Sequence, residues 1–354
     1  MKRTAIHTGT TSGVREVNKS LAIGELGYSP RRRPSSPKKI STPRRVPDKI
    51  EAGKHASAAP VLRVSEWKPY PWLIHGFSTR QGGVSKVYSR DPHCGELNLG
   101  FTPDDSRKNV LQNRKRFMQA VASGLASAVE KKGAPSLAML QQIHSGVIHK
   151  MDQALQAASA DRPLRGDGWI ADRPGTLLGI QTADCLPILV ADVRLRIVAA
   201  FHAGWRGTLA RIAQRGVGRL RAEFGCRPED LTAAIGPGIG SCCYAVGEEV
   251  RMEFSSQFAY ADALFQEIFD LDPIKEKYPM LFLTARAPGH SNLGPSTHLD
   301  LPEANRRQLQ DAGMQPDKIH VLDMCTACNS AQFFSHRGEH GFTGRMLNVI
   351  GVAN

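Results

Sequence analysis

The chain has 354 residues, of which 41% are hydrophobic, and a net charge of +13. No uninterrupted apolar run approaches the roughly 18 residues that a membrane span requires, so we expect a globular body without a membrane role. Residues 1–60 carry thirteen Lys and Arg against four acids, a net charge of +9, which leaves +4 for the rest. This split argues against a body that binds nucleic acid, although the basic segment could contact anions non-specifically.

The seven cysteines are an odd number in a chain that lacks a secretory hydrophobic region. A reducing, cytoplasmic location is therefore expected. Each cysteine is then a thiol that packs, acts as a nucleophile or binds a metal.

Residues 1–60 are expected to form a disordered basic extension. The stretch Tyr28–Pro47 is rich in Pro, Ser, Arg and Lys and has no apolar period, so it cannot bury enough surface to offset the entropy of ordering.

From Val61 onward, apolar runs that end in Gly, Pro or Asp alternate with helical patterns, as in a mixed α/β domain. We predict one domain over residues 61–354. Its expected elements, in chain order, are a strand Leu73–Thr79, a helix Arg107–Lys131, strands Leu137–His144, Thr176–Gln181, Leu186–Ala191 and Arg196–Phe201, and helices Thr208–Glu223, Gly247–Phe254 and Pro302–Ala312, the last capped by Asp300.

The segment Gln181–Gly207 is typical of an antiparallel hairpin. A two-residue turn at Val193 and Arg194 would place Cys185 directly opposite His202, with their Cβ atoms roughly 5 Å apart. The turn lacks Gly and Asn, so a longer loop with a small register slip is also open. The pair is either the core of a site or a small buried thiol beside a hydrogen-bonded histidine.

His144 ends the predicted strand Leu137–His144 and completes a set of two histidines and one cysteine with Cys185 and His202. Three protein ligands leave one position open, as in a catalytic zinc site. His149 is a weaker competitor for the ligand position.

Two other cysteine motifs carry weaker signals. Cys325 and Cys328 have the CxxC spacing of a zinc half-site or redox motif, but no clear second CxxC completes it. Cys242 and Cys243 lie in a glycine-rich loop that could cradle an anion, or whose glycines could simply permit positive φ.

Arg80 and Arg206 both lie in glycine-flanked turns, where a ligand can approach the backbone closely. A guanidinium in such a turn is a candidate for binding phosphate through two parallel hydrogen bonds.

Seven motifs together resemble one family, the multicopper polyphenol oxidase or laccase-domain family. They are HGFSTRQGGVS (75–85), LNLG (97–100), QQIH (141–144), QTADCLP (181–187), HAGWRG (202–207), AIGPGIGSCCYAVGEEV (234–250) and FFSHR (333–337). The resemblance spans nearly all of residues 61–354. It departs from the family pattern in the basic extension and at His336, where a tyrosine is usual.

The resemblance implies a single α/β sandwich domain with mixed sheets, and zinc at His144, Cys185 and His202. It also implies purine nucleoside phosphorylase activity with adenosine deamination, and Arg80 and Arg206 near the substrate or phosphate. The family also includes a peptidoglycan-editing factor.

An open zinc site can activate water for attack on C6 of adenosine. Asp184 is then a candidate proton carrier, or a group that orients a ligand. In phosphorolysis, Arg80 and Arg206 would orient the phosphate that attacks the ribose C1′.

Three alternatives remain open. A copper oxidase is disfavoured, since the sequence contains no His-x-His pair and three ligands of this type suit zinc or at most one copper. A metal-free amidase with Cys185 activated by His202 would leave His144 without a role. A cell-wall editing protein has no local motif for or against it.

Overall fold

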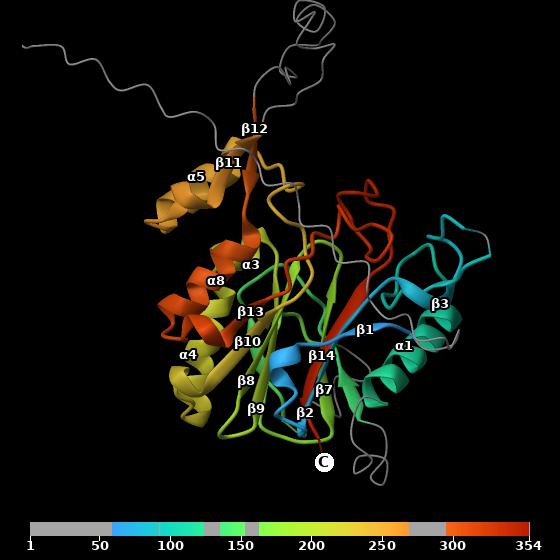
Figure 1. Cartoon of the computed structure of the whole chain (residues 1–354), viewed down its shortest axis with the longest axis horizontal. Coiled ribbons are helices and arrows are strands. Elements are labelled where there is room, and N and C mark those ends of the chain that lie inside the picture. The colour runs from blue at the N-terminus through green and yellow to red at the C-terminus, as the bar shows by residue number, and fades with distance from the viewer. Residues whose placement is uncertain (1–58, 92, 124–134, 153–162, 269–294, 354) are drawn as a thin grey trace, which may run out of the picture. The chain divides into compact units, whose positions relative to one another are not determined.

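The computed structural model describes residues 59–91, 93–123, 135–152, 163–268 and 295–353. The predicted disordered extension, residues 1–60, lies almost wholly outside them. The described chain is a mixed α/β structure with two mixed sheets, as predicted (Figure 1). Within this part, no helix has the length and apolarity needed to cross a bilayer.

The first sheet has five strands in the order β1-β2-β14-β7-β4, and the second has six in the order β13-β10-β8-β9-β6-β5. The strands of the first are β1 (Val61–Leu62), β2 (Leu73–Ser78), β14 (Met346–Val352), β7 (Thr176–Thr182) and β4 (Ser136–Ala138). Those of the second are β13 (Ile319–Val321), β10 (Leu231–Ile235), β8 (Leu186–Asp192), β9 (Ile197–Ala203), β6 (Gly168–Ala171) and β5 (Ile148–Lys150).

The remaining elements are helices and short strands around these sheets. Strands β11 (Phe265–Ile268) and β12 (Ser296–Leu299) pair with each other, and β3 spans Gln81–Ser85. The α-helices are α1 (Arg107–Ala122), α3 (Trp205–Leu209), α4 (Ile212–Phe224), α5 (Glu248–Gln257) and α8 (Leu301–Asp311). Short 3₁₀ helices span Ser65–Trp67, Pro228–Asp230, Ala261–Leu264 and Pro316–Lys318.

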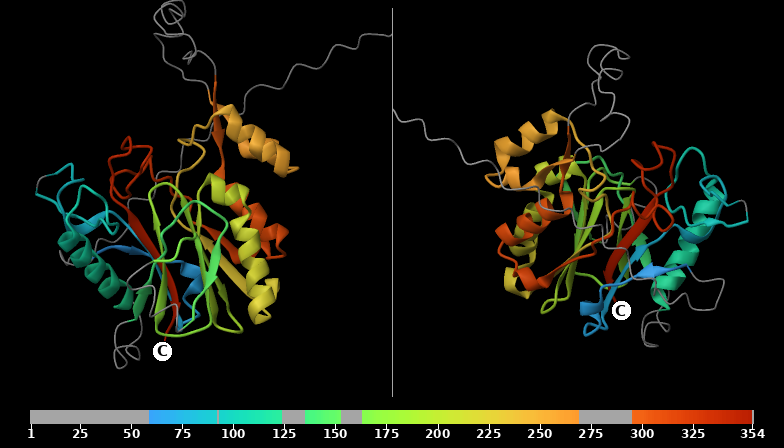
Figure 2. Two further views of the ribbon diagram at one scale, coloured as in Figure 1. Left: turned by 180° about the vertical axis from the view of Figure 1, so that it is seen from behind. Right: turned by 45° about the horizontal axis from the view of Figure 1, so that its top comes forward.

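The two sheets pack face to face between layers of helices (Figures 1 and 2). Leu178 and Ile350 of the first sheet and Leu189 and Val198 of the second share one buried cluster. Helix α1 covers the outer face of the first sheet, and α4 and α8 cover that of the second. Because β8 and β9 are covered on both faces, they read in sequence as continuous apolar runs.

The β8–β9 hairpin forms with the longer loop and small register slip that the sequence left open, and the two-residue turn at Val193 and Arg194 is wrong. Residues 193–196 make a four-residue loop, and Pro187, rather than Cys185, pairs with His202. The Asp192 carboxylate accepts hydrogen bonds from the backbone N–H groups of Arg194 and Leu195, which stabilises the longer loop. The register differs from the predicted one by two residues, so the side chain of Cys185 stays on the same face as that of His202 and lies diagonally across from it.

Two other element boundaries differ from the prediction. The strand expected at Leu137–His144 ends at Ala138, because the next backbone groups bond outside the sheet: Gln141 N–H donates to the carbonyl of Leu164. The helix expected at Thr208–Glu223 is two helices, α3 and α4, separated by Arg211 in the left-handed region at φ 57°.

The other helices match closely. The Ser106 side chain caps α1, and the predicted extension of this helix toward Lys131 lies outside the described residues. The predicted cap of α8 is confirmed, since the Asp300 side chain accepts the N–H of Glu303.

Candidate metal centre

The structure brings His144, Cys185 and His202 together at one end of the two sheets. Their ligand atoms all lie within 4.8 Å of one another. His202 comes from the end of β9, Cys185 from the turn between β7 and β8, and His144 from the loop before β5. His144 is exposed, Cys185 is half-buried and His202 is buried, so the cluster opens to solvent on the His144 side.

Cys185 lies where the chain passes from one sheet to the other. Only residues 183–185 separate β7 of the first sheet from β8 of the second, and Asp184 adopts a φ of 90° to make this turn. A non-glycine residue in this conformation is strained and persists only where its surroundings hold it. The short crossover therefore fixes the Cys185 thiol at the rim of both sheets.

Asp167, which sequence reasoning missed, connects the two histidines. Its side chain is fully buried. One oxygen accepts hydrogen bonds from His202 Nδ1 at 2.8 Å and from the backbone N–H of His144 at 2.9 Å. The other accepts from the N–H and the hydroxyl of Ser145, at 2.6 and 2.7 Å. With Nδ1 of His202 held in this way, Nε2 is left for the cluster.

The charges in the cluster favour an ionised thiol. Burial raises the pKa of Cys185, but the positive charge of His202 and a hydrogen bond from His144 outweigh it and lower the pKa to about 6. Burial likewise opposes the charge on Asp167, but hydrogen bonds from His202 and Ser145 lower its pKa to about 2. Thiolate is the form of cysteine that binds metals and acts as a nucleophile.

The pKa of His202 rises for the matching reason. Burial lowers it, but the Cys185 charge and the hydrogen bond to Asp167 raise it to about 9. The rise comes from the two acidic groups that flank the buried ring, Cys185 and Asp167. A metal cation bound to Nε2 would replace the proton on that nitrogen.

The hydrogen bonds of Asp184 do not suit a proton carrier, because its carboxylate is occupied by three donors. Its carboxylate accepts from the hydroxyls of Thr326 and Ser335, at 2.6 and 2.7 Å, and from the backbone N–H of Arg337 at 2.6 Å. This geometry favours the second predicted role, because the carboxylate holds the loop after β13 against the turn that carries Cys185.

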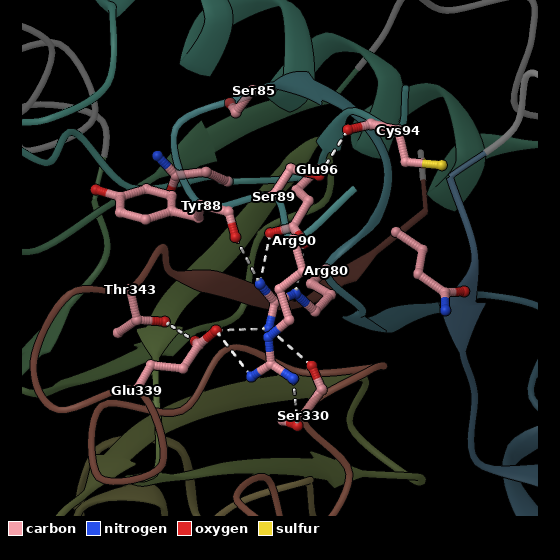
Figure 3. Close-up of polar contacts among 12 residues, drawn as sticks. Arg80, Ser85, Tyr88, Ser89, Arg90, Cys94, Glu96, Ser330, Glu339 and Thr343 are labelled. Atoms are coloured by element: carbon pink, nitrogen blue, oxygen red, sulfur yellow. Dashed lines mark hydrogen bonds and ion pairs between the residues drawn. The ribbon is translucent and has the colours of Figure 1, made fainter. Parts of the chain in front are cut away.

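Arg80 is buried rather than presented to a ligand (Figure 3). It donates two hydrogen bonds to Glu96, at 2.7 and 3.0 Å, one to Glu339 at 2.8 Å, and others to the carbonyls of Ser330 and Tyr88. These acceptors occupy its Nε and both terminal nitrogens. The geometry favours a structural role, and phosphate binding by Arg80 would require breaking this network.

Arg206 is exposed in α3, four residues after His202, with its guanidinium 4.3 Å from the centre of the Trp205 ring. Tyr244 lies near both Arg206 and Cys185: burial raises the pKa of its hydroxyl, and the nearby Cys185 charge raises it further. The hydroxyl of Tyr244 therefore keeps its proton.

The remaining sequence candidates lie elsewhere. His149 bonds through Nε2 to the carbonyl of Arg165 at 2.9 Å and is outside the cluster. His336 is exposed. The structure does bring Cys242 and Cys243 beside Cys325 and Cys328, which sequence reasoning treated separately.

Comparison with known proteins identifies close relatives. The model of the family described as multi-copper polyphenol oxidoreductase laccase matches residues 74–353. A purine nucleoside phosphorylase of Deinococcus radiodurans is 36% identical over 84% of this chain and 94% of its own length. The purine nucleoside phosphorylase YlmD of Geobacillus stearothermophilus is 34% identical over 80% of this chain and 91% of its own.

The solved structures agree with the fold. The crystal structure of YlmD from Geobacillus stearothermophilus has a TM-score of 0.63 at 30% identity, and covers 81% of this chain and 94% of that one. YfiH of Bacillus licheniformis has a TM-score of 0.66 at 30% identity, and covers 84% and 98%.

Gly204 offers a test of the cluster that leaves every ligand in place. A Cβ at this position would lie 2.8 Å from Cys185 Sγ and 3.2 Å from His144 Cδ2. We expect Gly204→Ala to remove about one metal ion per chain from the purified protein, measured by elemental mass spectrometry. Its φ of −78° suits alanine, so the backbone itself should not be strained.

Gly218→Ala is the matched control. It lies in α4, where a Cβ meets nothing within 4 Å. This change should leave the metal content unchanged and stabilise the helix by up to about 1 kcal/mol. Wild-type metal content in Gly204→Ala would show that the three residues do not form the metal centre.

Proposed function

Because the chain belongs to the multi-copper polyphenol oxidoreductase laccase family, we propose that it is a purine nucleoside phosphorylase whose reaction takes place beside a zinc ion held by His144, Cys185 and His202. The catalytic domain in this proposal is residues 61–354. The observation that carries it is the convergence of these three ligand atoms, at the rim of both sheets, in a protein whose curated relatives are phosphorylases.

The donor set fits zinc. Two imidazoles and one thiolate match the ligands that zinc takes in catalytic sites, where a fourth position is left to water or substrate. The exposure of His144 gives that position an approach from solvent. The Asp167–His202 hydrogen bond is the carboxylate–histidine pairing that orients a metal-bound imidazole. When bound, zinc there would polarise a substrate oxygen or lower the pKa of water.

A multicopper centre fits less well. Such a centre needs several clustered imidazoles, and the described cluster at this site contains two. The third ligand also weakens the metal-free amidase alternative, since a Cys185–His202 pair acting alone leaves His144 unused.

Phosphorolysis requires phosphate to attack C1′ of the ribose while the bond from C1′ to the purine breaks and the base leaves with a proton. Arg206 is suited to orient the phosphate, because its guanidinium is exposed and lies over the ring of Trp205. Tyr244 keeps its proton and can donate a hydrogen bond to the nucleoside. We place Arg206 in the phosphate role that the sequence assigned jointly to Arg80 and Arg206.

Adenosine deamination is a second candidate activity, favoured by the open side of the cluster. In this reaction water adds at C6 and ammonia leaves, which gives inosine without any phosphate. Deamination can therefore be distinguished from phosphorolysis, because its rate should not depend on phosphate.

The proposal is tested by incubating the purified protein with inosine or adenosine, with and without phosphate. We expect free base and ribose 1-phosphate only when phosphate is present. Cys185→Ala should lower the activity by more than about 100-fold, because it removes a metal ligand, whereas loss of a group that only hydrogen-bonds to a ligand lowers it by about 10- to 100-fold. Cys94→Ser, which changes an exposed cysteine outside the cluster of His144, Cys185 and His202, serves as the control. Equal activity in Cys185→Ala, or no phosphate-dependent product, would contradict the proposal.

Arg206→Ala should raise the KM for phosphate by about 10- to 100-fold, the loss expected when one hydrogen-bonding charge is removed. Arg206→Lys should recover part of this affinity. Arg194→Ala, at the opposite end of the β8–β9 hairpin, is the matched control and should leave the KM unchanged. A rise in the KM for the nucleoside alone would assign Arg206 to the nucleoside instead.

A further inference from the structure

A second group of ligand atoms lies outside the centre described above. The four thiols of Cys242, Cys243, Cys325 and Cys328 lie within 4.8 Å of one another. The first two come from the loop between β10 and α5, and the other two from the segment after β13. Two loops about 80 residues apart in sequence thus bring their thiol groups together.

The distances suit a shared ion better than a disulfide. Cys328 Sγ lies 3.3 Å from Cys242 Sγ and 3.3 Å from Cys243 Sγ, so neither pairing is preferred. A disulfide requires about 2.05 Å between two sulfurs. Four sulfurs around one zinc at about 2.3 Å would lie about 3.8 Å apart, close to what the four thiols show.

The backbone around the sulfurs is held in place. Gly238 pairs with Cys325 in a parallel bridge, and the N–H of Thr326 donates to the carbonyl of Gly238 at 3.0 Å. Asn329 closes the CxxC turn by donating from both its backbone N–H and its side chain to the carbonyl of Cys325. Backbone hydrogen bonds therefore hold the two segments that carry the four cysteines in fixed positions.

Gly240 leaves room for the cluster. A Cβ there would lie 3.3 Å from Cys325 Cβ and 3.4 Å from Cys242 Sγ. Because glycine has no Cβ, the backbone at Gly240 can lie close to the thiols of Cys242 and Cys325.

We propose that Cys242, Cys243, Cys325 and Cys328 bind a second zinc ion, as a closed structural site. Four thiolates fill the tetrahedral coordination of zinc and leave no position for substrate. All-sulfur coordination selects zinc among common divalent ions over magnesium, calcium or manganese. The Cys325–Cys328 half of this site is completed not by a second CxxC but by the vicinal pair Cys242 and Cys243.

The ion fastens the loop after β10 to the loop after β13. The latter carries Thr326, Ser335 and Arg337, whose hydrogen bonds hold Asp184 beside Cys185. The N–H of Ile239, in the former, donates to the carbonyl of Asp184 at 2.8 Å. The second ion thus supports the strained turn that presents Cys185, although it touches no substrate.

The test counts and characterises metal in the full-length protein purified under reducing conditions and supplied with zinc. Wild-type protein should contain about two zinc ions per chain, and Cys185→Ala should retain one. X-ray absorption of Cys185→Ala should then show four sulfur neighbours at about 2.3 Å and no nitrogen. Cys328→Ser should retain one ion with mixed nitrogen and sulfur neighbours. Cys94→Ser, the control, should retain two.

Two results would overturn the proposal. One is a Cys185→Ala protein that is folded, by circular dichroism, but free of zinc. The other is a Cys242–Cys328 or Cys243–Cys328 disulfide found by peptide mass spectrometry in that protein. The Cys185→Ala readout does not depend on Cys328→Ser folding. Nor does it depend on catalysis, so loss of the phosphorylase proposal would leave it unaffected.

Discussion

The buried carboxylate of Asp167 is the constraint on which the placement of His144 and His202 depends. It has no exposed surface and accepts hydrogen bonds from His202 Nδ1, from the backbone of His144 and from Ser145. A buried charge is tolerated only when such partners compensate its desolvation. The same partners that keep Asp167 ionised also fix the ring of His202 and fold the loop of His144, so the histidines cannot be placed independently of it.

Cys185 reaches the same point by a different route, through the short crossover between the sheets. Its turn is strained at Asp184, whose side chain and carbonyl are bonded to the loops after β13 and β10. The four-cysteine cluster joins those two loops. The arrangement thus links the four-cysteine cluster, the strained turn at Asp184 and the cluster of His144, Cys185 and His202.

Much of this could be predicted from the sequence, for identifiable reasons. Strands β7, β8 and β9 are buried on both faces, so their apolar runs predicted them as strands. Cys185 was also correctly expected beside His202, because a register shift of two residues leaves each side chain on the same face of the sheet. The strand expected to end at His144 was wrong, since side-chain and loop hydrogen bonds draw this backbone out of the sheet. Asp167 had no local signal beyond an acid between two glycines. Two of the groups that bind the Arg80 guanidinium, Ser330 and Glu339, lie 250 and 259 residues further along the chain, so the burial of Arg80 could not be derived from its local sequence.

The most direct measurement is the zinc affinity of Asp167→Asn in competition with a chelator. An asparagine keeps the shape of the side chain but replaces one acceptor oxygen with a donor, so it cannot serve both His202 and Ser145. The affinity of the three-ligand centre should fall by about 10- to 100-fold. Asp192→Asn is the control, since this equally buried carboxylate lies at the far end of β8, about 20 Å along the strand. Wild-type affinity in Asp167→Asn would contradict the account.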